Sequence, residues 1–178
     1  LLILKVSTIG LLIKLDYFIR QSYMVKAMPH YSVTSEDQLD TAAYDLQRLF
    51  NKIIKHYDNT IIQGWRPLFE QEKLWRAGLS KVKHGKHNTS PSQAVDSAPY
   101  LPNRGIPWPQ VPQNWANKSE RDAYMKDLAQ FYNYAGFVLG TAANMGIQIR
   151  WGGDWDRDNE VMDQSFNDLV HFELVKGT

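Results

Sequence analysis

Two segments that lie far apart in this 178-residue chain each carry an imidazole and a carboxylate. His87 precedes Asp96 by nine positions, and Asp168 precedes His171 by three. A hydrolytic zinc ion needs three nitrogen or oxygen ligands with a fourth position left open, and a further carboxylate to take a proton from the attacking water. The pattern predicts one zinc ion bound by His87, Asp96 and His171, with Asp168 as the general base.

Other readings of these residues stay open. His84 lies three positions before His87 and could replace it as a ligand, although its neighbours favour a solvated loop. Taken singly, a histidine in a strand or an aspartate in a turn is more often structural than catalytic. Glu173 shares a strand face with His171, so it is either an outer partner of the metal site or a structural carboxylate.

The composition predicts one globular domain without nucleic-acid binding. The chain is 43% hydrophobic, which is enough to bury a core at this length. The formal net charge is +1, and there is no basic stripe of the kind that follows phosphates. Cysteine is absent, so any metal must be held by His, Asp or Glu. We expect a monomer.

Residues 1–23 are set apart from the domain expected at 24–178. They are an apolar run interrupted by Lys5 and Lys14 and followed by Asp16, too short and too charged for a stable membrane span. A dispensable leader, an amphipathic helix on a membrane surface and a helix packed on the domain are the three possibilities.

Periodicity predicts the elements that must position the site. Helical patterns with start and stop signals occupy residues 35–56, 67–78 and 119–146. Strand patterns occupy residues 60–65, 93–98, 147–151 and 171–175. Residues 99–117 are rich in proline and should form an irregular loop beside a cleft. Because strands and helices alternate too rarely for a doubly wound sheet, we predict an α+β fold with a small antiparallel sheet packed against helices.

Five motifs occur in a fixed order from about Ile61 to the end of the chain. They are Gln63-Gly-Trp-Arg66, Glu70-Gln71 with Leu74-Trp75 and Gly78-Leu-Ser80-Lys81, His87 to Ala94-Val-Asp96, Trp151-Gly-Gly-Asp-Trp155 and Asp168-Leu-Val-His171-Phe-Glu. In this order the chain resembles the zinc-dependent peptidoglycan peptidases, which include phage L-alanyl-D-glutamate endolysins and bacterial D-alanyl-D-alanine carboxypeptidases.

Two details of the motifs bear on the branch of that family. The aspartate before the last histidine and the Trp-Gly-Gly-Asp-Trp segment favour the endolysins, since the carboxypeptidases resemble one another in having a glutamate there and a tryptophan just before the histidine. His87 and Asp96 are nine positions apart, where the compact family motif has seven. The extra residues fall in the turn-forming stretch 88–92, so we expect a longer loop with both ligands kept.

The resemblance implies the zinc D,D-peptidase/hedgehog-like fold and hydrolysis of peptidoglycan stem peptides, with the L-Ala–D-Glu bond as the expected target, for host lysis by a phage. It gives Arg66 the role of stabilising developing negative charge or of gripping a substrate carboxylate. Gln71 would bind substrate or orient Arg66. The protein would be made in the host cytoplasm and act on the wall or in the periplasm, with secretion as the alternative. The competing functions are a D-Ala-D-Ala carboxypeptidase in cell-wall maturation and a non-catalytic wall-binding module.

Two further features are ambiguous in the sequence. The acidic loop 154–160 begins like a calcium-binding loop, but it has Asn159 at the sixth position and Ser165 at the twelfth, where that motif has Gly and Glu. It is therefore either a calcium site or a solvated acidic loop. Trp151 and Trp155 either line the substrate groove or pack into the core.

Overall fold

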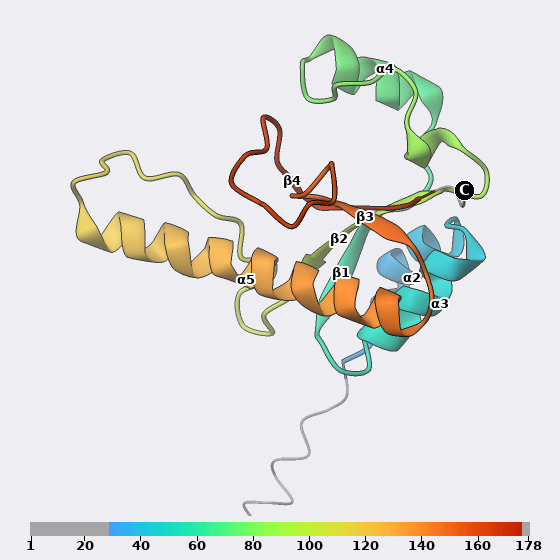
Figure 1. Cartoon of the computed structure of the whole chain (residues 1–178), viewed down its shortest axis with the longest axis horizontal. Coiled ribbons are helices and arrows are strands. Elements are labelled where there is room, and N and C mark those ends of the chain that lie inside the picture. Colours follow the sequence, from blue (N-terminus) through green and yellow to red (C-terminus); the bar gives the residue numbers. More distant parts are fainter. Residues whose placement is uncertain (1–28, 176–178) are drawn as a thin grey trace, which may run out of the picture.

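The computed structural model describes residues 29–175, so the expectations for residues 1–23 lie outside the described residues. The elements in chain order are α2 (Val33–Asp40), α3 (Tyr44–Ile53), β1 (Asn59–Gln63), α4 (Leu68–Arg76), η1 (Lys86–Asn88), β2 (Ala94–Pro99), α5 (Lys118–Asn144), β3 (Ile149–Gly152) and β4 (Asp168–Leu174) (Figure 1). Over residues 29–175 the strands form one antiparallel sheet in the order β1-β2-β4-β3. The predicted α+β fold class is confirmed.

The hydrophobic core lies between one face of this sheet and the helices α3 and α5. The long helix α5 contacts β2, β3, β4 and α3, while α2 packs against β1 (Figure 1). The most deeply buried side chains are Leu46, Leu49, Phe50 and Ile53 of α3, Tyr134, Ala135, Val138 and Ala142 of α5, and Val95 and Phe172 of the sheet. Burying these groups stabilises the sheet on its helical side, which leaves the opposite face available for polar chemistry.

The register of β2 and β4 places functional residues on that opposite face. Val95 is paired with Phe172, and both are fully buried in the core. Because successive side chains of a strand point to opposite faces, the next pair, Asp96 and His171, projects away from the helices. The alternation in the sequence therefore specifies which side of the sheet carries the imidazole and the carboxylate.

An irregularity between β3 and β4 affects Asp168. Trp151 is paired with Phe172, whereas the next residue, Gly152, is paired with Asp168. Three extra residues of β4 are therefore accommodated at this point, as in a large β-bulge. In a regular strand Asp168 and His171 would face opposite sides, but with this bulge both line the same cleft. Gly152 permits it, since a Cβ there would lie 2.3 Å from the carbonyl oxygen of Asp168.

Several predicted element boundaries are wrong. The helix expected over residues 35–56 is two helices, because Thr41 and Ala43 form backbone hydrogen bonds with Ser92 and interrupt it. The N-cap of the first is Ser32, whose hydroxyl accepts from the amide of Ser35. Asn117, two residues before the expected start, caps α5 in the same way. The last strand begins at Asp168 instead of residue 171.

The helix α4 stands on the side of the sheet opposite to α5 (Figure 1). Within Leu68–Arg76 only Gln71 is buried, so this helix contributes little to the core. Its following loop, residues 77–85, leads back to η1 and so to His87. No helix within residues 29–175 is long and apolar enough to cross a bilayer.

Candidate metal centre

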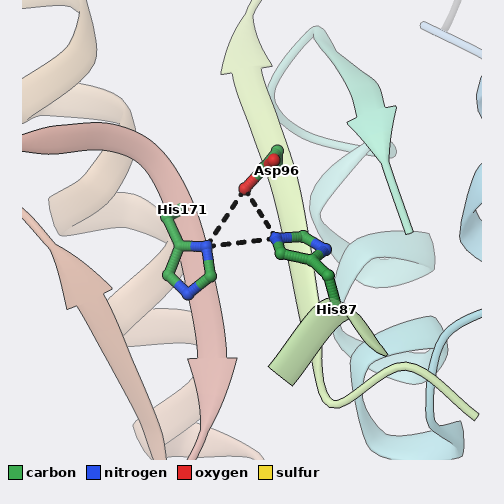
Figure 2. A group of neighbouring side chains, drawn as sticks. All are labelled: His87, Asp96 and His171. Carbon is green, nitrogen blue, oxygen red and sulfur yellow. Dashed lines mark hydrogen bonds and ion pairs between the residues drawn. The ribbon is translucent and has the colours of Figure 1, made fainter. Parts of the chain in front are cut away.

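Three side chains from distant parts of the chain converge on the open face of the sheet. His87 comes from η1, Asp96 from β2 and His171 from β4, and all three point toward one another (Figure 2). The Nε2 atom of His87 lies 3.0 Å from Oδ1 of Asp96 and 3.2 Å from Nδ1 of His171, and the last two atoms are 3.1 Å apart. All three residues are buried. The structure thus brings together the three predicted metal-ligating residues.

The spacing of these atoms fits one tetrahedral metal ion. Zinc binds histidine nitrogen and carboxylate oxygen at about 2.0–2.2 Å, so two of its ligand atoms stand about 3.3–3.5 Å apart. The triangle of Nε2, Oδ1 and Nδ1 atoms has sides only slightly shorter than this. Two imidazoles and one carboxylate also form the ligand set of many catalytic zinc sites. The three residues could hold a metal ion.

Main-chain contacts orient His87. Its Nδ1–H donates to the carbonyl oxygen of Gly64 at 2.6 Å, which leaves the lone pair on Nε2, the atom that faces Asp96. The backbone of Arg66 donates to the carbonyl of His87 at 2.9 Å, so the turn after β1 is tied to η1. Gly64 is required here, since a Cβ would lie 2.0 Å from the carbonyl oxygen of Gln38.

A carboxylate orients His171 from its other side. Its Nε2 lies 3.1 Å from Oε2 of Glu173, so the ring donates there and presents Nδ1 toward Asp96. Glu173 in turn accepts from the guanidinium of Arg150. Glu173 thus links the His171 imidazole to Arg150, and its role as an outer partner of a metal site stays a prediction.

The charges of the site favour ionised Asp96 and protonated His171. Burial disfavours the charged carboxylate of Asp96, but the neighbouring imidazoles of His171 and His87 outweigh the effect of burial and hold the pKa of Asp96 well below the usual range. For His171, burial opposes protonation, and the hydrogen bonds to Asp96 and Glu173 raise its pKa to about 9. A region this negative attracts a cation, whether a proton or a metal ion.

Arg66 and Gln71 lie immediately beyond the three converging side chains. One guanidinium nitrogen of Arg66 donates to Oδ2 of Asp96 at 3.0 Å, and the other donates to the side-chain oxygen of Gln71 at 3.0 Å. The amide of Gln71 donates to Ser80 and to the carbonyl of Val82, both at 2.8 Å. Gln71 is 2% exposed. Gln71 therefore connects the Arg66 guanidinium to the loop after α4, and both of its expected roles, orienting Arg66 and binding substrate, stay predictions.

A cleft of about 660 Å³ opens over the site, and Asp168, Arg66 and Gln71 line it together with the three converging side chains. Burial, with the charge of Asp96 next, raises the pKa of the Asp168 carboxyl. The positive charges of His171 and Arg66 oppose this shift without cancelling it. Asp168 is therefore a carboxylate with increased affinity for a proton, beside the converging imidazoles.

The remaining candidates fall at different distances from the centre. His84 lines the cleft but is exposed and is not one of the three converging residues. Trp155 lies in the cleft with its ring 5.4 Å from that of His171, whereas Trp151 is buried in the core. Carboxylate oxygens of Asp154, Asp156 and Asp158 lie within 4.8 Å of one another, so these residues could also hold a metal ion. Both expectations for the acidic loop, a calcium site and a solvated loop, stay predictions.

Two parts of the site were not found by sequence reasoning. The Gly64 carbonyl that orients His87 carries no side-chain signal. Arg150 could have been suspected, because it alternates with buried residues in a strand beside the double glycine, but only the register of β3 and β4 places it opposite Glu173.

Comparison with known proteins identifies the family of this chain. A family model described as phage L-alanyl-D-glutamate peptidase matches residues 28–122 and 115–175. The L-alanyl-D-glutamate peptidase of Escherichia phage T5 is 29% identical over 153 residues, covering 82% of this chain and 97% of that protein. The crystal structure of the Serratia marcescens L-Ala D-Glu endopeptidase ChiX has the same fold, with a TM-score of 0.56 at 24% identity over 85% of this chain and 95% of that one. The chain belongs to the phage L-alanyl-D-glutamate peptidase family.

Proposed function

We propose that this peptidase uses one zinc ion to hydrolyse the amide bond between L-alanine and D-glutamate in peptidoglycan stem peptides, and that it serves in lysis of a bacterial host. The observation that carries the proposal is the triangle of ligand atoms from His87, Asp96 and His171 at the floor of the cleft. Membership of the phage L-alanyl-D-glutamate peptidase family supplies the substrate class.

Zinc is the metal that suits this ligand set. Two neutral imidazole nitrogens and a carboxylate are borderline ligands, which favour zinc over the all-oxygen sites of calcium and magnesium. When bound, zinc lowers the pKa of water toward about 7 and polarises a carbonyl group. His87 and His171 are both held by hydrogen bonds at their second ring nitrogens, so the ligand geometry is fixed in advance.

Asp168 acts as the general base. It lies in the cleft beside the ligands, and its raised pKa makes it a stronger proton acceptor than an ordinary aspartate. It takes a proton from the attacking water and later delivers that proton to the leaving amine of D-glutamate. Arg66 stabilises the negative charge that develops on the carbonyl oxygen, because its guanidinium is fixed beside Asp96 and is permanently charged.

The cleft is built from the residues of one chain, and we propose that the protein acts as a monomer. It would be made in the host cytoplasm and reach the wall when the membrane is breached during lysis. A single symmetric peak of monomer mass in size-exclusion chromatography with light scattering is expected, and a dimer peak would contradict this part of the proposal.

Purified peptidoglycan provides the main test. We expect the zinc-loaded protein to clear a suspension of purified walls, a chelator to stop the clearing, and added zinc to restore it. Mass spectrometry of the soluble products should show stem peptides beginning with D-glutamate and glycan strands that retain L-alanine. Release of single D-alanine residues would point instead to carboxypeptidase activity, and binding to walls without any release would point to a non-catalytic module.

A further inference from the structure

Within residues 29–175, one lysine ammonium that lines the cleft has no carboxylate or carbonyl partner. Four lysine and arginine side chains line it. Arg66 and Arg150 are paired with carboxylates of the metal site, and Lys86 donates to a main-chain carbonyl at 3.1 Å. Lys81 is the fourth, and within residues 29–175 its ammonium has no carboxylate or carbonyl partner. A free ammonium at the rim of a cleft is suited to bind an anionic group of a ligand.

A row of rings connects this ammonium to the metal centre. The Nζ atom of Lys81 lies 5.4 Å above the ring of Phe166, which stacks on Trp155 with 6.4 Å between centroids. The Trp155 ring is in turn 5.4 Å from the imidazole of His171. The attraction between an ammonium and a ring face positions the lysine without using its N–H donors. Lys81 and the proposed zinc ligand are therefore parts of the same cleft.

The Arg66 guanidinium is poorly placed to be the main anchor of a substrate carboxylate. Its two terminal nitrogens already donate to Asp96 and Gln71, both at 3.0 Å. A substrate carboxylate at Arg66 would gain less Coulomb attraction than one at an unpaired ammonium, because Asp96 already balances the charge of this guanidinium. Lys81 is therefore a better candidate than Arg66 for binding a substrate carboxylate.

We propose that Lys81 binds a free carboxylate of the stem peptide on the D-glutamate side of the scissile bond. This inference rests on the proposed function, which places a stem peptide in the cleft. The peptide continues from the γ-carboxyl of D-glutamate, so the α-carboxylate next to the scissile amide stays free unless the wall amidates it. A diamino acid at the third position can carry a second such carboxylate. Lys81 would make the enzyme prefer walls in which the bound carboxylate is not amidated.

Binding measurements separate this claim from catalysis. The full-length, zinc-loaded protein carrying Asp168→Asn is titrated by calorimetry with three stem peptides. One peptide has both free carboxylates, one has the glutamate α-amide, and one has an amide on the side carboxylate of the third residue. Lys81→Met keeps the length of the side chain and removes its charge, and we expect it to raise Kd about tenfold for the peptide with both carboxylates. One of the two amidated peptides lacks the carboxylate that Lys81 binds. For that peptide, Lys81→Met should leave Kd unchanged.

Two further variants complete the design. Lys83→Met is the matched control, because the Lys83 ammonium lies 4.1 Å over the Trp75 ring and this lysine does not line the cleft. It should change none of the three Kd values, and Lys81→Arg should retain the selectivity. Equal weakening of all three peptides by Lys81→Met, no weakening of any, or no binding by the parent protein would overturn the proposal. Cleavage by the wild-type enzyme is measured separately by mass spectrometry, so selective binding without cleavage would count against the proposed function alone.

Discussion

Asp96 and His171 are directly opposite each other on the antiparallel strands β2 and β4, with Oδ1 and Nδ1 3.1 Å apart. The same register pairs Val95 with Phe172 in the core. A slip of one residue would expose that apolar pair and separate the two polar side chains, so packing of the core also fixes the geometry of the candidate metal centre. Two of the three proposed ligands are thus part of the most buried region of the sheet.

The first prediction concerns Asp96 itself. Asp96→Asn keeps the size of the side chain but removes its charge, and the purified variant should contain far less zinc than the equimolar amount expected for the wild type. Zinc should raise the melting temperature of the wild-type protein, because an ion that binds only the folded state stabilises it, and should not raise that of the variant. Asp45→Asn on α3 is a control on an exposed carboxylate. Equal zinc content in wild type and Asp96→Asn would contradict the ligand assignment.

The second prediction concerns the outer partner of His171. Glu173→Gln removes the carboxylate that accepts from Nε2 and that is held by Arg150, and we expect zinc affinity to fall by about 10- to 100-fold. The loss should be smaller than for Asp96→Asn, since the ligand itself remains. Competition with a chelating dye measures both. Glu36→Gln, on the exposed surface of α2, should leave the affinity unchanged, and a similar loss in that variant would show that the effect is not local.

The sequence predicted which side chains converge better than it predicted the elements around them. The chain has no cysteine, so only His, Asp and Glu could hold a metal ion. This restriction drew attention to His87, Asp96 and His171. The sequence also predicted that the side chains of Asp96 and Val95 lie on opposite faces of the sheet, because this depends only on the two-residue period of a strand. The interruption of the first helix was not, because it comes from hydrogen bonds to Ser92, a residue about fifty positions later.

The bulge in β4 shows why the remaining parts could not be predicted. Period-two alternation applied to Asp168 and His171 places them on opposite faces, and only the pairing of Gly152 with Asp168 reveals that they share one. The partner of His171 was likewise undecided, since Glu173 on the same strand face could equally have been structural. Contacts between strands decide such questions, and a single sequence contains no direct record of them.

The third prediction tests the general base. Asp168→Asn should lower kcat by about 10²- to 10⁴-fold, the usual contribution of a positioned acid or base, while zinc content stays at the wild-type level. Loss of zinc together with activity would instead make Asp168 a ligand. A neutral asparagine cannot accept the proton at any pH in the accessible range, so raising the pH should not restore the rate.

The pH dependence of the wild-type enzyme gives the fourth prediction. The pKa of Asp168 is raised by its burial and by Asp96, and a base works only when deprotonated. The value of kcat/KM should therefore fall as the pH is lowered, with a midpoint above the ordinary aspartate pKa of about 3.9. Zinc content must be measured across the same pH range, because loss of metal in acid would give a similar limb. A midpoint below the ordinary value, with zinc retained, would contradict the assignment of Asp168.

The fifth prediction is that Gln71 acts through Arg66. Gln71→Leu keeps a buried side chain of similar size but removes the oxygen that accepts from the guanidinium, so Arg66 loses one of the two contacts that fix it. We expect kcat to fall by about 10- to 100-fold, as for a displaced catalytic group. Arg66→Lys keeps the charge without the planar fork and should cost about 10²-fold.

The double variant distinguishes positioning from direct action. If Gln71 matters only because it orients the Arg66 guanidinium, then Arg66→Lys with Gln71→Leu should be no slower than Arg66→Lys alone, since the group to be oriented is already gone. If Gln71 contacted the substrate directly, the two losses would multiply and KM would rise with Gln71→Leu in either background. Because Gln71 also holds Ser80 and Val82 in the loop after α4, the melting temperature of each variant must be compared with that of the wild type. Multiplicative losses with unchanged melting temperatures would assign Gln71 to substrate binding.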